Sequence, residues 1–376
     1  GDVELTLPAA TLAREMSLMQ GVVERRTPHQ ILSNVLLEAR EQTLTLTATD
    51  LDTTFVSEIE LLSLKTGGAV TVPARRLFDV VRDLPASSEV RLRVLENHHV
   101  QIDCKEPKLR IRLNGLPATD FPTRPEAAGG PTLTLTFGAL RRMVEKVRFA
   151  VSTEEIRLQL QGALLKPKGT GLEMAATDGH RLALIEVEEA TAEPGFEAIL
   201  VSKKVLDELS RLDADDDTPV TIVRGTNHIG FTVGRRRIFS KLDDRRFPDY
   251  EKVISKDNTK RATVVRDELL GAVRRISLLS GDRLKAVSLS FKEGALVVSS
   301  ESQDVGDGDQ EIAAEYEADA ITLRLNSRYL EQFLEACDTE KVHLFVKDEG
   351  SQCQGRPAEP VPGLKSYLYV VMPMRV

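Results

Sequence analysis

The sequence predicts an α+β protein built from three tandem copies of one domain, each with two helices packed on antiparallel strands. Two independent patterns repeat in one register. A strand that ends in a polar turn occurs at residues 44–50, at 172–178 and, more weakly, at 296–302. A second pattern, the start of a helix, occurs at residues 73–82, 201–210 and 325–334. Because solenoid units run only roughly 20 to 50 residues, each copy here is large enough to be a domain in itself.

The chain length and two loop-like segments indicate where the domain boundaries lie. A chain of 376 residues is expected to hold two to three domains, and the repeat favours three. A segment rich in Pro and Gly at 122–131 and a polar run at 255–260 separate the copies. We therefore place the domains at residues 1–128, 129–257 and 258–376.

Each copy begins with an amphipathic helix, which is indicated by apolar residues at helical spacing. These residues are Leu12, Met16, Met19 and Val23 in the first copy, Leu140, Val144, Val147 and Val151 in the second, and Leu269, Val273 and Ile276 in the third. Alternating strands follow, and then a second helix, which in the first copy carries Leu77, Phe78, Val81 and Leu84. Further strands, such as 90–94 and 220–223, complete each copy. Two apolar helix faces need a common sheet surface to pack on, which predicts a layered α+β domain.

Composition narrows the class of protein. The three cysteines, Cys104, Cys337 and Cys353, have no CxxC spacing and are odd in number, so neither a zinc site nor a secreted disulfide framework is indicated. No run of 18 apolar residues occurs, so no membrane segment is expected. We expect a soluble protein of the reducing cytoplasm.

Cations gather on the predicted helices although the formal net charge is −8. The helix starts and first-helix faces carry Arg75, Arg76, Arg141, Arg142, Lys146, Arg148, Lys203, Lys204, Arg274 and Arg275. For any single helix, a solvated charged face explains this well. Recurrence on equivalent helices favours a common basic surface, where potentials add and a phosphate backbone could be followed.

Three short strings carry a family resemblance. They are Ala-Thr-Asp-Gly-His-Arg-Leu-Ala at 176–183, Arg-Phe-Pro-Asp-Tyr at 246–250 and the terminal Tyr-Val-Val-Met-Pro-Met-Arg-Val at 369–376. Together with the three copies they resemble the bacterial DNA polymerase III beta subunits, the DNA sliding clamps, over essentially the whole chain. The resemblance implies a head-to-tail homodimer that closes into a ring of six domains, with helices lining the hole. It implies that double-stranded DNA faces Arg26, Arg75, Arg141, Arg142 and Lys203.

The resemblance also implies a groove between the second and third copies that binds short partner peptides with Leu and Phe anchors. The implied partners are the DNA polymerase III alpha subunit, the clamp loader, translesion polymerases and mismatch-repair proteins. By motif, the groove should be lined by Arg157, Leu160, Thr177, Gly179, His180, Arg181, Leu182, Pro248, Val253, Asn326, Tyr329, Val370, Val371, Met372, Pro373, Met374 and Arg375.

The implied dimer contact joins Arg76, Ile111 and Leu113 of one chain to Leu278 and Leu279 of the other. The chain departs from the family in two places. The loop at 153–159 holds Thr153, Glu154, Leu158 and Gln159 where the family often has aromatic or amide residues facing DNA, and Glu154 would repel phosphate. The segment 350–356 is also unusual for a groove rim.

Catalysis is not indicated by the motifs. Asp178 and His180 lie on one strand-to-turn segment without an HxxxH or HxH spacing, and the GxSxG, GxxxxGK[ST] and GxGxxG motifs are missing. An Asp after a strand commonly accepts turn N–H bonds, so we expect Asp50 and Asp178 to be structural. We expect a protein that is not an enzyme, with no catalytic residue, metal or cofactor.

Two rival functions stay open at this stage. A monomeric three-domain scaffold could bind peptides without encircling DNA, and its solution mass would distinguish it from a clamp. A repeat-built nuclease or DNA-modifying enzyme would need a cluster of carboxylates that metal ions could share. The acidic run at 213–217 is interpreted instead as a solvated loop.

Overall fold

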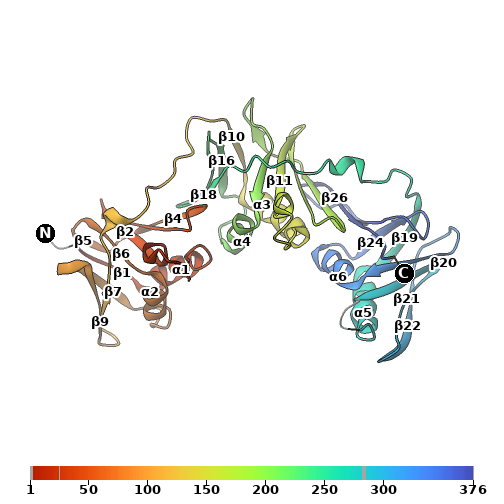
Figure 1. Ribbon diagram of the computed structural model, residues 1–376, viewed down its shortest axis with the longest axis horizontal. Coiled ribbons are helices and arrows are strands. Elements are labelled where there is room, and N and C mark those ends of the chain that lie inside the picture. Colours follow the sequence, from red (N-terminus) through yellow and green to blue (C-terminus); the bar gives the residue numbers. More distant parts are fainter. Residues whose placement is uncertain (1–2, 25, 282–284, 376) are drawn as a thin grey trace. The chain divides into compact units, whose positions relative to one another are not determined.

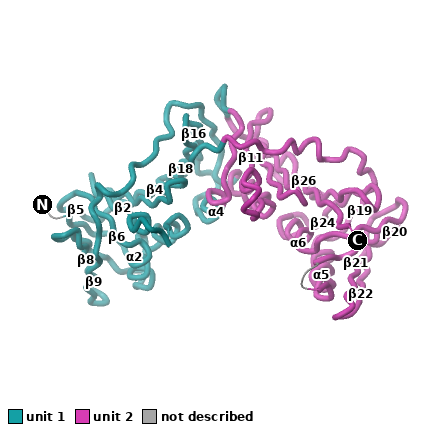
Figure 2. The backbone as a smooth tube through the Cα atoms, in the orientation of Figure 1, with its two compact units in different colours: residues 1–138, 192–196, 207–243 teal, residues 139–191, 197–206, 244–376 magenta. Residues whose placement is uncertain are grey.

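The computed structural model describes residues 3–24, 26–281 and 285–375 in two compact units (Figures 1 and 2). Unit 1 comprises residues 1–138, 192–196 and 207–243, and unit 2 comprises residues 139–191, 197–206 and 244–376. The units follow the sheets and not the predicted domain limits, so the boundaries at 128/129 and 257/258 remain a prediction.

Within the described residues, six α-helices each begin immediately after a strand. These pairs are β1 (Glu4–Pro8) with α1 (Ala9–Met19), β6 (Gly68–Pro73) with α2 (Ala74–Val81), β10 (Thr132–Thr136) with α3 (Phe137–Val147), β15 (Ile199–Ser202) with α4 (Lys203–Arg211), β19 (Lys260–Val265) with α5 (Arg266–Ser277), and β23 (Ile321–Asn326) with α6 (Ser327–Ala336). Leu12, Leu140 and Leu269 occupy the corresponding position of the first helix in each copy, and all three are fully buried. The predicted order of strands and helices is confirmed.

Unit 1 contains two antiparallel sheets. The first has the order β5 (Ser63–Thr66), β1, β7 (Glu89–Val94), β8 (His99–Cys104) and β9 (Leu109–Asn114). The second has the order β14 (Thr191–Ala192), β10, β16 (Pro219–Arg224), β17 (His228–Val233), β18 (Arg236–Lys241), β4 (Thr53–Glu60), β3 (Thr43–Thr49), β2 (Asn34–Arg40) and β6. Phe55 of β4 pairs with Ile238 of β18, so this sheet joins segments far apart in the chain.

Unit 2 repeats the arrangement. Its larger sheet has the order β15, β11 (Gly162–Lys168), β12 (Gly171–Thr177), β13 (Arg181–Val187), β26 (Leu364–Val371), β25 (Cys353–Pro357), β24 (Lys341–Val346) and β19. Its smaller sheet has the order β22 (Gly306–Ala313), β21 (Ala295–Ser302), β20 (Ala286–Lys292) and β23. Leu182 of β13 pairs with Val370 of β26. The C-terminal strand is therefore the partner of the strand that carries the Arg-Leu-Ala string.

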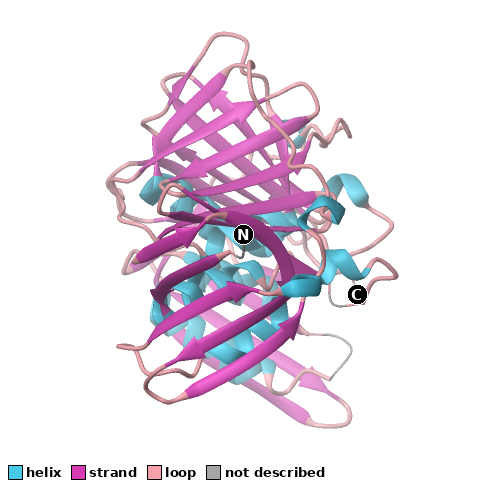
Figure 3. Ribbon diagram, turned by 90° about the vertical axis from the view of Figure 1, so that its left-hand side faces the viewer, coloured by secondary structure: helices cyan, strands magenta, loops and turns pink. Residues whose placement is uncertain are grey.

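Within each unit helices pack against the sheets (Figures 1 and 3), and α1 lies beside α2 in unit 1 as α5 lies beside α6 in unit 2. Their buried faces are apolar: Leu12, Met16 and Leu77 in unit 1, and Val273 and Phe333 in unit 2, are fully buried. Burying such a side chain contributes roughly 1.5–3 kcal/mol, so the two apolar helix faces hold each layer in place.

Three residues predicted on helical faces lie beyond the helices. Val23 follows α1, because the chain turns at Gly21 and Val22 donates to the Met19 carbonyl. Val151 follows a short 3₁₀ turn at Arg148–Ala150, although it is buried as expected. Leu84 follows α2. In these places the apolar period continues for a few residues after the α-helix has ended.

The structural role predicted for the two aspartates is confirmed. Asp178 Oδ1 accepts hydrogen bonds from the main-chain N–H of His180 at 2.9 Å and of Arg181 at 3.1 Å. Asp50 Oδ1 accepts from Asp52 at 2.9 Å and from Thr53 at 2.7 Å. Each aspartate closes the turn between two strands of its copy.

Candidate functional site

A cluster of side chains in unit 2 brings together most of the residues expected to bind partners. We call it the partner surface and define it by the 177–182 turn and strand start, the first two turns of α6 and the tail 370–375. At the turn, Gly179 has φ +90°, a value that favours glycine, and an added Cβ would lie 2.5 Å from Arg157 Nη1. The turn and Arg157 are thus in close contact.

Arg181 is the centre of the partner surface. Only 8% of it is exposed, and its guanidinium donates to Asp178 Oδ2 at 3.1 Å, to the Phe149 carbonyl at 2.7 Å and to the Tyr369 hydroxyl at 3.3 Å. A further hydrogen bond goes from Arg181 Nη1 to Gln332 Oε1. Buried charges require such partners, and these contacts join β13 to the end of α3, to α6 and to β26.

An aromatic cluster surrounds this guanidinium. Its carbon lies 4.2 Å from the centroid of the Tyr329 ring, a favourable cation–π distance. Tyr329 also stacks with His180, with ring centroids 6.4 Å apart. Burial, followed by the nearby charge of Asp178, raises the pKa of Tyr329, so its hydroxyl is neutral at pH 7. The surface here consists of the paired rings of Tyr329 and His180, with the Arg181 guanidinium against Tyr329.

Asn326 and Tyr329 are placed by one local motif. The Asn326 side chain caps α6 by accepting hydrogen bonds from the main-chain N–H groups of Arg328 at 2.9 Å and Tyr329 at 3.2 Å. The Tyr369 hydroxyl donates to the Tyr329 carbonyl at 2.9 Å. Strand β26 is therefore tied to the first turn of α6.

The tail continues past β26 as an extended segment. Met372 N–H donates to the His180 carbonyl at 3.0 Å, and Met374 N–H donates to the Arg324 carbonyl at 2.7 Å. Val370 and Val371 are buried, whereas 41% of Met372 is exposed. Pro373 and Met374 are half-buried, and Arg375 is exposed. The tail thus lies between the 177–181 turn and β23, with one methionine open to solvent.

The apolar part of the surface mixes buried and exposed side chains. Leu182 and Val370 lie in one buried cluster with Tyr250, and Leu160 is also buried. Val253 is 50% exposed, and Pro248 is exposed on the segment that precedes it. Thr177, whose hydroxyl donates to the Arg181 carbonyl at 2.6 Å, braces the turn.

The unusual segment 350–356 is hydrogen-bonded to the segment that contains Val253 and Ser255. Gln352 Nε2 donates to the Val253 carbonyl at 2.8 Å, and Gln354 Nε2 donates to the Ser255 carbonyl at 2.8 Å. Gln352 Oε1 accepts from the Ser255 N–H at 3.0 Å. The two glutamines are buried and attach the linker that carries Val253 to β25.

Sequence reasoning missed Phe149 and Gln332, and it gave no individual role to Tyr369, the first residue of the terminal string, or to Gln352, within the rim segment 350–356. Gln332 follows Tyr329 by three residues on a helix, and this spacing places both on one face, so the i,i+3 rule could have indicated it. The other three come from segments far along the chain, and no local pattern places them near Arg181 or Val253.

The expected DNA-facing cations are distributed over both units. Arg26 and Arg75 lie in unit 1 and are exposed, and Arg75 pairs with Asp79 at 3.2 Å. Arg141, Arg142 and Lys203 lie in unit 2 and are half-buried. Arg142 Nη1 donates to the Pro362 carbonyl at 2.6 Å, so this cation also holds the loop before β26.

Of the expected dimer residues, Ile111 and Leu113 lie on an edge strand, and Arg76, Leu278 and Leu279 lie on or just after helices. Ile111 and Leu113 belong to β9, the edge strand of the five-stranded sheet, and Arg76 is exposed on α2. Leu278 is 76% exposed just after α5, and Leu279 lies under Gly308 of the edge strand β22. Each set is therefore beside an unpaired strand edge within its own unit.

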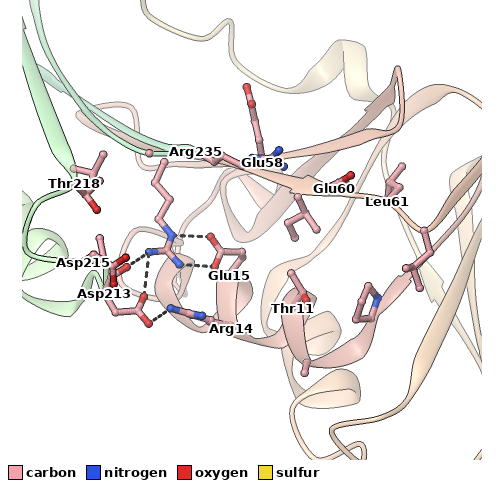
Figure 4. A pocket seen from close by; sticks show the side chains of 18 residues that line it. Thr11, Arg14, Glu15, Glu58, Glu60, Leu61, Asp213, Asp215, Thr218 and Arg235 are labelled. Atoms are coloured by element: carbon pink, nitrogen blue, oxygen red, sulfur yellow. Dashed lines mark hydrogen bonds and ion pairs between the residues drawn. The ribbon is translucent and has the colours of Figure 1, made fainter.

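A concave region of about 860 Å³ lies in unit 1 between α1, the end of β4 and residues 213–215 (Figure 4). Glu15 and Arg236 form its base, and Arg236 also donates to Asp213 Oδ1 at 3.1 Å. Arg14 pairs with Asp213 as well. The acidic run, interpreted from sequence as a solvated loop, thus takes part in ion pairs that hold α1.

Among the described residues, no group of three or more His, Cys, Asp or Glu side chains is arranged to hold a metal ion. In the same part of the chain, none of the helices has the length and apolar character needed to span a bilayer.

The fold defines a sliding clamp. It matches the crystal structure of the sliding clamp, DNA polymerase III subunit beta, of Bartonella birtlesii with a TM-score of 0.93 and 31% identity, covering 100% of both chains. It matches that of Pseudomonas aeruginosa with a TM-score of 0.93 and 33% identity, again over 100% of both chains. Both of those clamps are bound to griselimycin.

Family models of the DNA polymerase III beta subunit match the chain in three consecutive parts: the N-terminal domain at residues 3–125, the central domain at 134–249 and the C-terminal domain at 251–375. The beta sliding clamp of Pseudomonas putida is 34% identical over 374 residues, covering 100% of both sequences. The chain belongs to the DNA polymerase III beta subunit family, and its function is that of a DNA sliding clamp.

Proposed function

We propose that two copies of the chain close head to tail into a ring around double-stranded DNA, and that other proteins dock through short peptides bound at the partner surface. The observation that carries the docking proposal is the combination, within unit 2, of exposed Val253 and Met372 with buried Leu182 and Val370, bordered by Arg181 and Tyr329. Apolar anchors of a peptide gain most where buried apolar surface is already preorganised.

The chemistry of this surface suits several peptides in turn. A Leu or Phe anchor would pack on Leu182, Val253 and Met374, and the thioethers of Met372 and Met374 repack easily around different side chains. The griselimycin complexes of two related clamps support a ligand-binding surface in this fold. We expect the peptides to come from the DNA polymerase III alpha subunit, the clamp loader, translesion polymerases and mismatch-repair proteins, all in the cytoplasm.

Complementary strand edges support the dimer. Edge strand β9 exposes Arg110 and Arg112, and edge strand β22 exposes Asp307, Asp309 and Glu311. An unpaired edge is a template for pairing with another chain, and opposite charges steer and align such a contact. Leu278, Leu279, Ile111 and Leu113 would supply the apolar part. Because the two edges differ, the contact is heterologous and closes only at the correct rotation.

The DNA contact would be made by phosphate-seeking cations rather than by base readout. Arg26 and Arg75 are exposed and Arg141, Arg142 and Lys203 are half-buried, and exchangeable phosphate contacts attract DNA without fixing a register. A ring held by topology can therefore slide. We assign no catalytic step to this chain; polymerase or nuclease activity would belong to its partners.

The docking proposal is tested by fluorescence anisotropy with a labelled Gln-Leu-Ser-Leu-Phe peptide. We expect saturable binding to the intact chain and loss of binding when residues 372–376 are removed. Val253→Asp should weaken binding strongly, whereas Val305→Asp, at another exposed apolar residue of unit 2, should not. If Val253→Asp and Val305→Asp bound the peptide with equal affinity, the partner surface would not be the peptide-binding site.

The ring proposal is tested by mass. Light scattering should give twice the chain mass of 41.6 kDa. A monomer at micromolar concentration, together with intact peptide binding, would favour the alternative of a three-domain peptide-binding scaffold that does not encircle DNA.

A further inference from the structure

We propose that Gln332 is a positioning residue of the partner surface, whose side-chain oxygen holds the Arg181 guanidinium over the ring of Tyr329. The inference rests on the proposed docking function. Gln332 lies on α6 three residues after Tyr329, so both side chains leave the same face of the helix. It is half-buried, and its Oε1 accepts from Arg181 Nη1.

The guanidinium donates to four acceptors. Nε donates to Asp178, Nη1 donates to Gln332 and to the Tyr369 hydroxyl, and Nη2 donates to the Phe149 carbonyl. Asp178 lies in the turn just before Arg181 and accepts from Nε, so it does not fix the terminal nitrogens Nη1 and Nη2. The Phe149 carbonyl and the 3.3 Å contact to Tyr369 remain, but neither replaces the acceptor on α6. Gln332 is therefore the α6 side chain that accepts directly from the Arg181 guanidinium, whereas Tyr369 links the two through its own hydroxyl.

The position of Arg181 affects the orientation of the Tyr329 ring, and through it the ring pair with His180. Its guanidinium carbon lies 4.2 Å from the centroid of Tyr329, and Tyr329 in turn stacks with His180. Without the Gln332 acceptor, a nearly buried cationic N–H loses its partner, and hydrogen bonds to charged groups are stronger than those between neutral groups. The guanidinium then gains by turning toward solvent, away from Tyr329 and into the space a peptide would occupy.

Gln332 is also a neutral acceptor. Of the side chains that accept from Arg181, only Asp178 carries a negative charge. A carboxylate at position 332 would keep the acceptor at the same place and add charge assistance. The variant Gln332→Glu should therefore preserve the geometry, whereas Gln332→Leu, of similar size, removes the acceptor.

The test measures the Kd of the labelled Gln-Leu-Ser-Leu-Phe peptide together with the melting temperature and solution mass of the full chain. We expect Gln332→Leu to weaken binding about tenfold, which corresponds to about 1.4 kcal/mol. Its mass and melting temperature should stay close to the parent values. Gln332→Glu should bind within about twofold of the parent. The control Glu335→Gln, one turn further on α6, should bind as the parent does.

The outcomes separate the two proposals. Parent-like binding by Gln332→Leu would overturn the positioning role and leave the docking proposal intact. Equal weakening by Gln332→Leu and Gln332→Glu would also overturn it, because the acceptor would then not be what matters. Absence of binding by the parent chain would instead refute the docking proposal itself. If Gln332→Leu loses its fold, Gln332→Met provides the same loss of acceptor with a flexible side chain.

Discussion

Arg236 donates two parallel hydrogen bonds to Glu15, from Nε to Oε1 at 2.8 Å and from Nη2 to Oε2 at 2.9 Å, and so joins β18 to α1 within unit 1. Ser57 Oγ donates to the same carboxylate at 2.5 Å. Burial alone would raise the pKa of Glu15, but the hydrogen bonds from Arg236 and Ser57 and the charges of Arg236 and Arg14 outweigh it, so the pKa is lowered.

Breaking this pair from one side should destabilise the protein. Arg236→Met leaves Glu15 buried without its cation, and loss of one partner of a buried pair typically costs about 3–5 kcal/mol. Lys65→Met, at an exposed pair with Glu4, is the matched control and should change little, because exposed pairs contribute about 0–1 kcal/mol. Urea unfolding measures the free energy of unfolding of both variants. Equal midpoints for the two variants would contradict the structural role of the pair.

Glu173 should make stability depend on pH in the acid range. Burial raises its pKa, but hydrogen bonds from the Tyr250 hydroxyl and from Lys168 at 2.9 Å, with the charges of Lys168 and Lys166, lower it below 4.5 overall. A lowered folded pKa means that the contribution is fully present above about pH 4.5 and is lost as pH falls through the folded value. We therefore expect the gap in melting temperature between the parent and Glu173→Gln to narrow below pH 4.5. A gap that is constant down to pH 3 would refute this.

The cysteines should be unreactive in the folded protein. Cys104, Cys337 and Cys353 are free and buried, and burial raises the pKa of both Cys337 and Cys353 to about 12. Since the thiolate is the reactive form, a thiol reagent at pH 8 should react slowly with native protein and with three thiols after denaturation. Fast native reaction would show that these segments open readily.

Charge reversal should weaken the proposed dimer and double reversal should restore it. Asp309→Lys on β22 places like charges opposite Arg110 and Arg112 of the partner edge, so we expect the dimer Kd to rise about tenfold, measured by analytical ultracentrifugation at low salt. Combining Asp309→Lys with Arg112→Glu should recover most of the affinity. As a control, Glu293→Lys on the β20–β21 turn should leave the Kd unchanged. Failure of the double variant to recover would place these strands outside the interface.

Local pattern was sufficient for much of the fold. The apolar stripes with Leu12, Leu140 and Leu269 predicted the first helix of each copy, because helical periodicity is a property of neighbouring residues. The turn roles of Asp50 and Asp178 were predictable for the same reason, since each accepts N–H groups two and three residues ahead. The family strings also indicated the partner surface, although nothing local could show how its parts meet.

The tertiary structure alone decided which distant residues meet. Arg181 reaches Gln332 and Tyr369 only because β13 pairs with β26 and β26 is tied to α6, and Glu15 meets Arg236 only because β4 pairs with β18. The physical reason is that strand pairing is a long-range choice: the same alternating strand can pair with many others, and the partner chosen determines which polar side chains become buried together. The sequence by itself thus determined the repeated domain and its turns, while sheet pairing decided the environment of Arg181 and of Glu15.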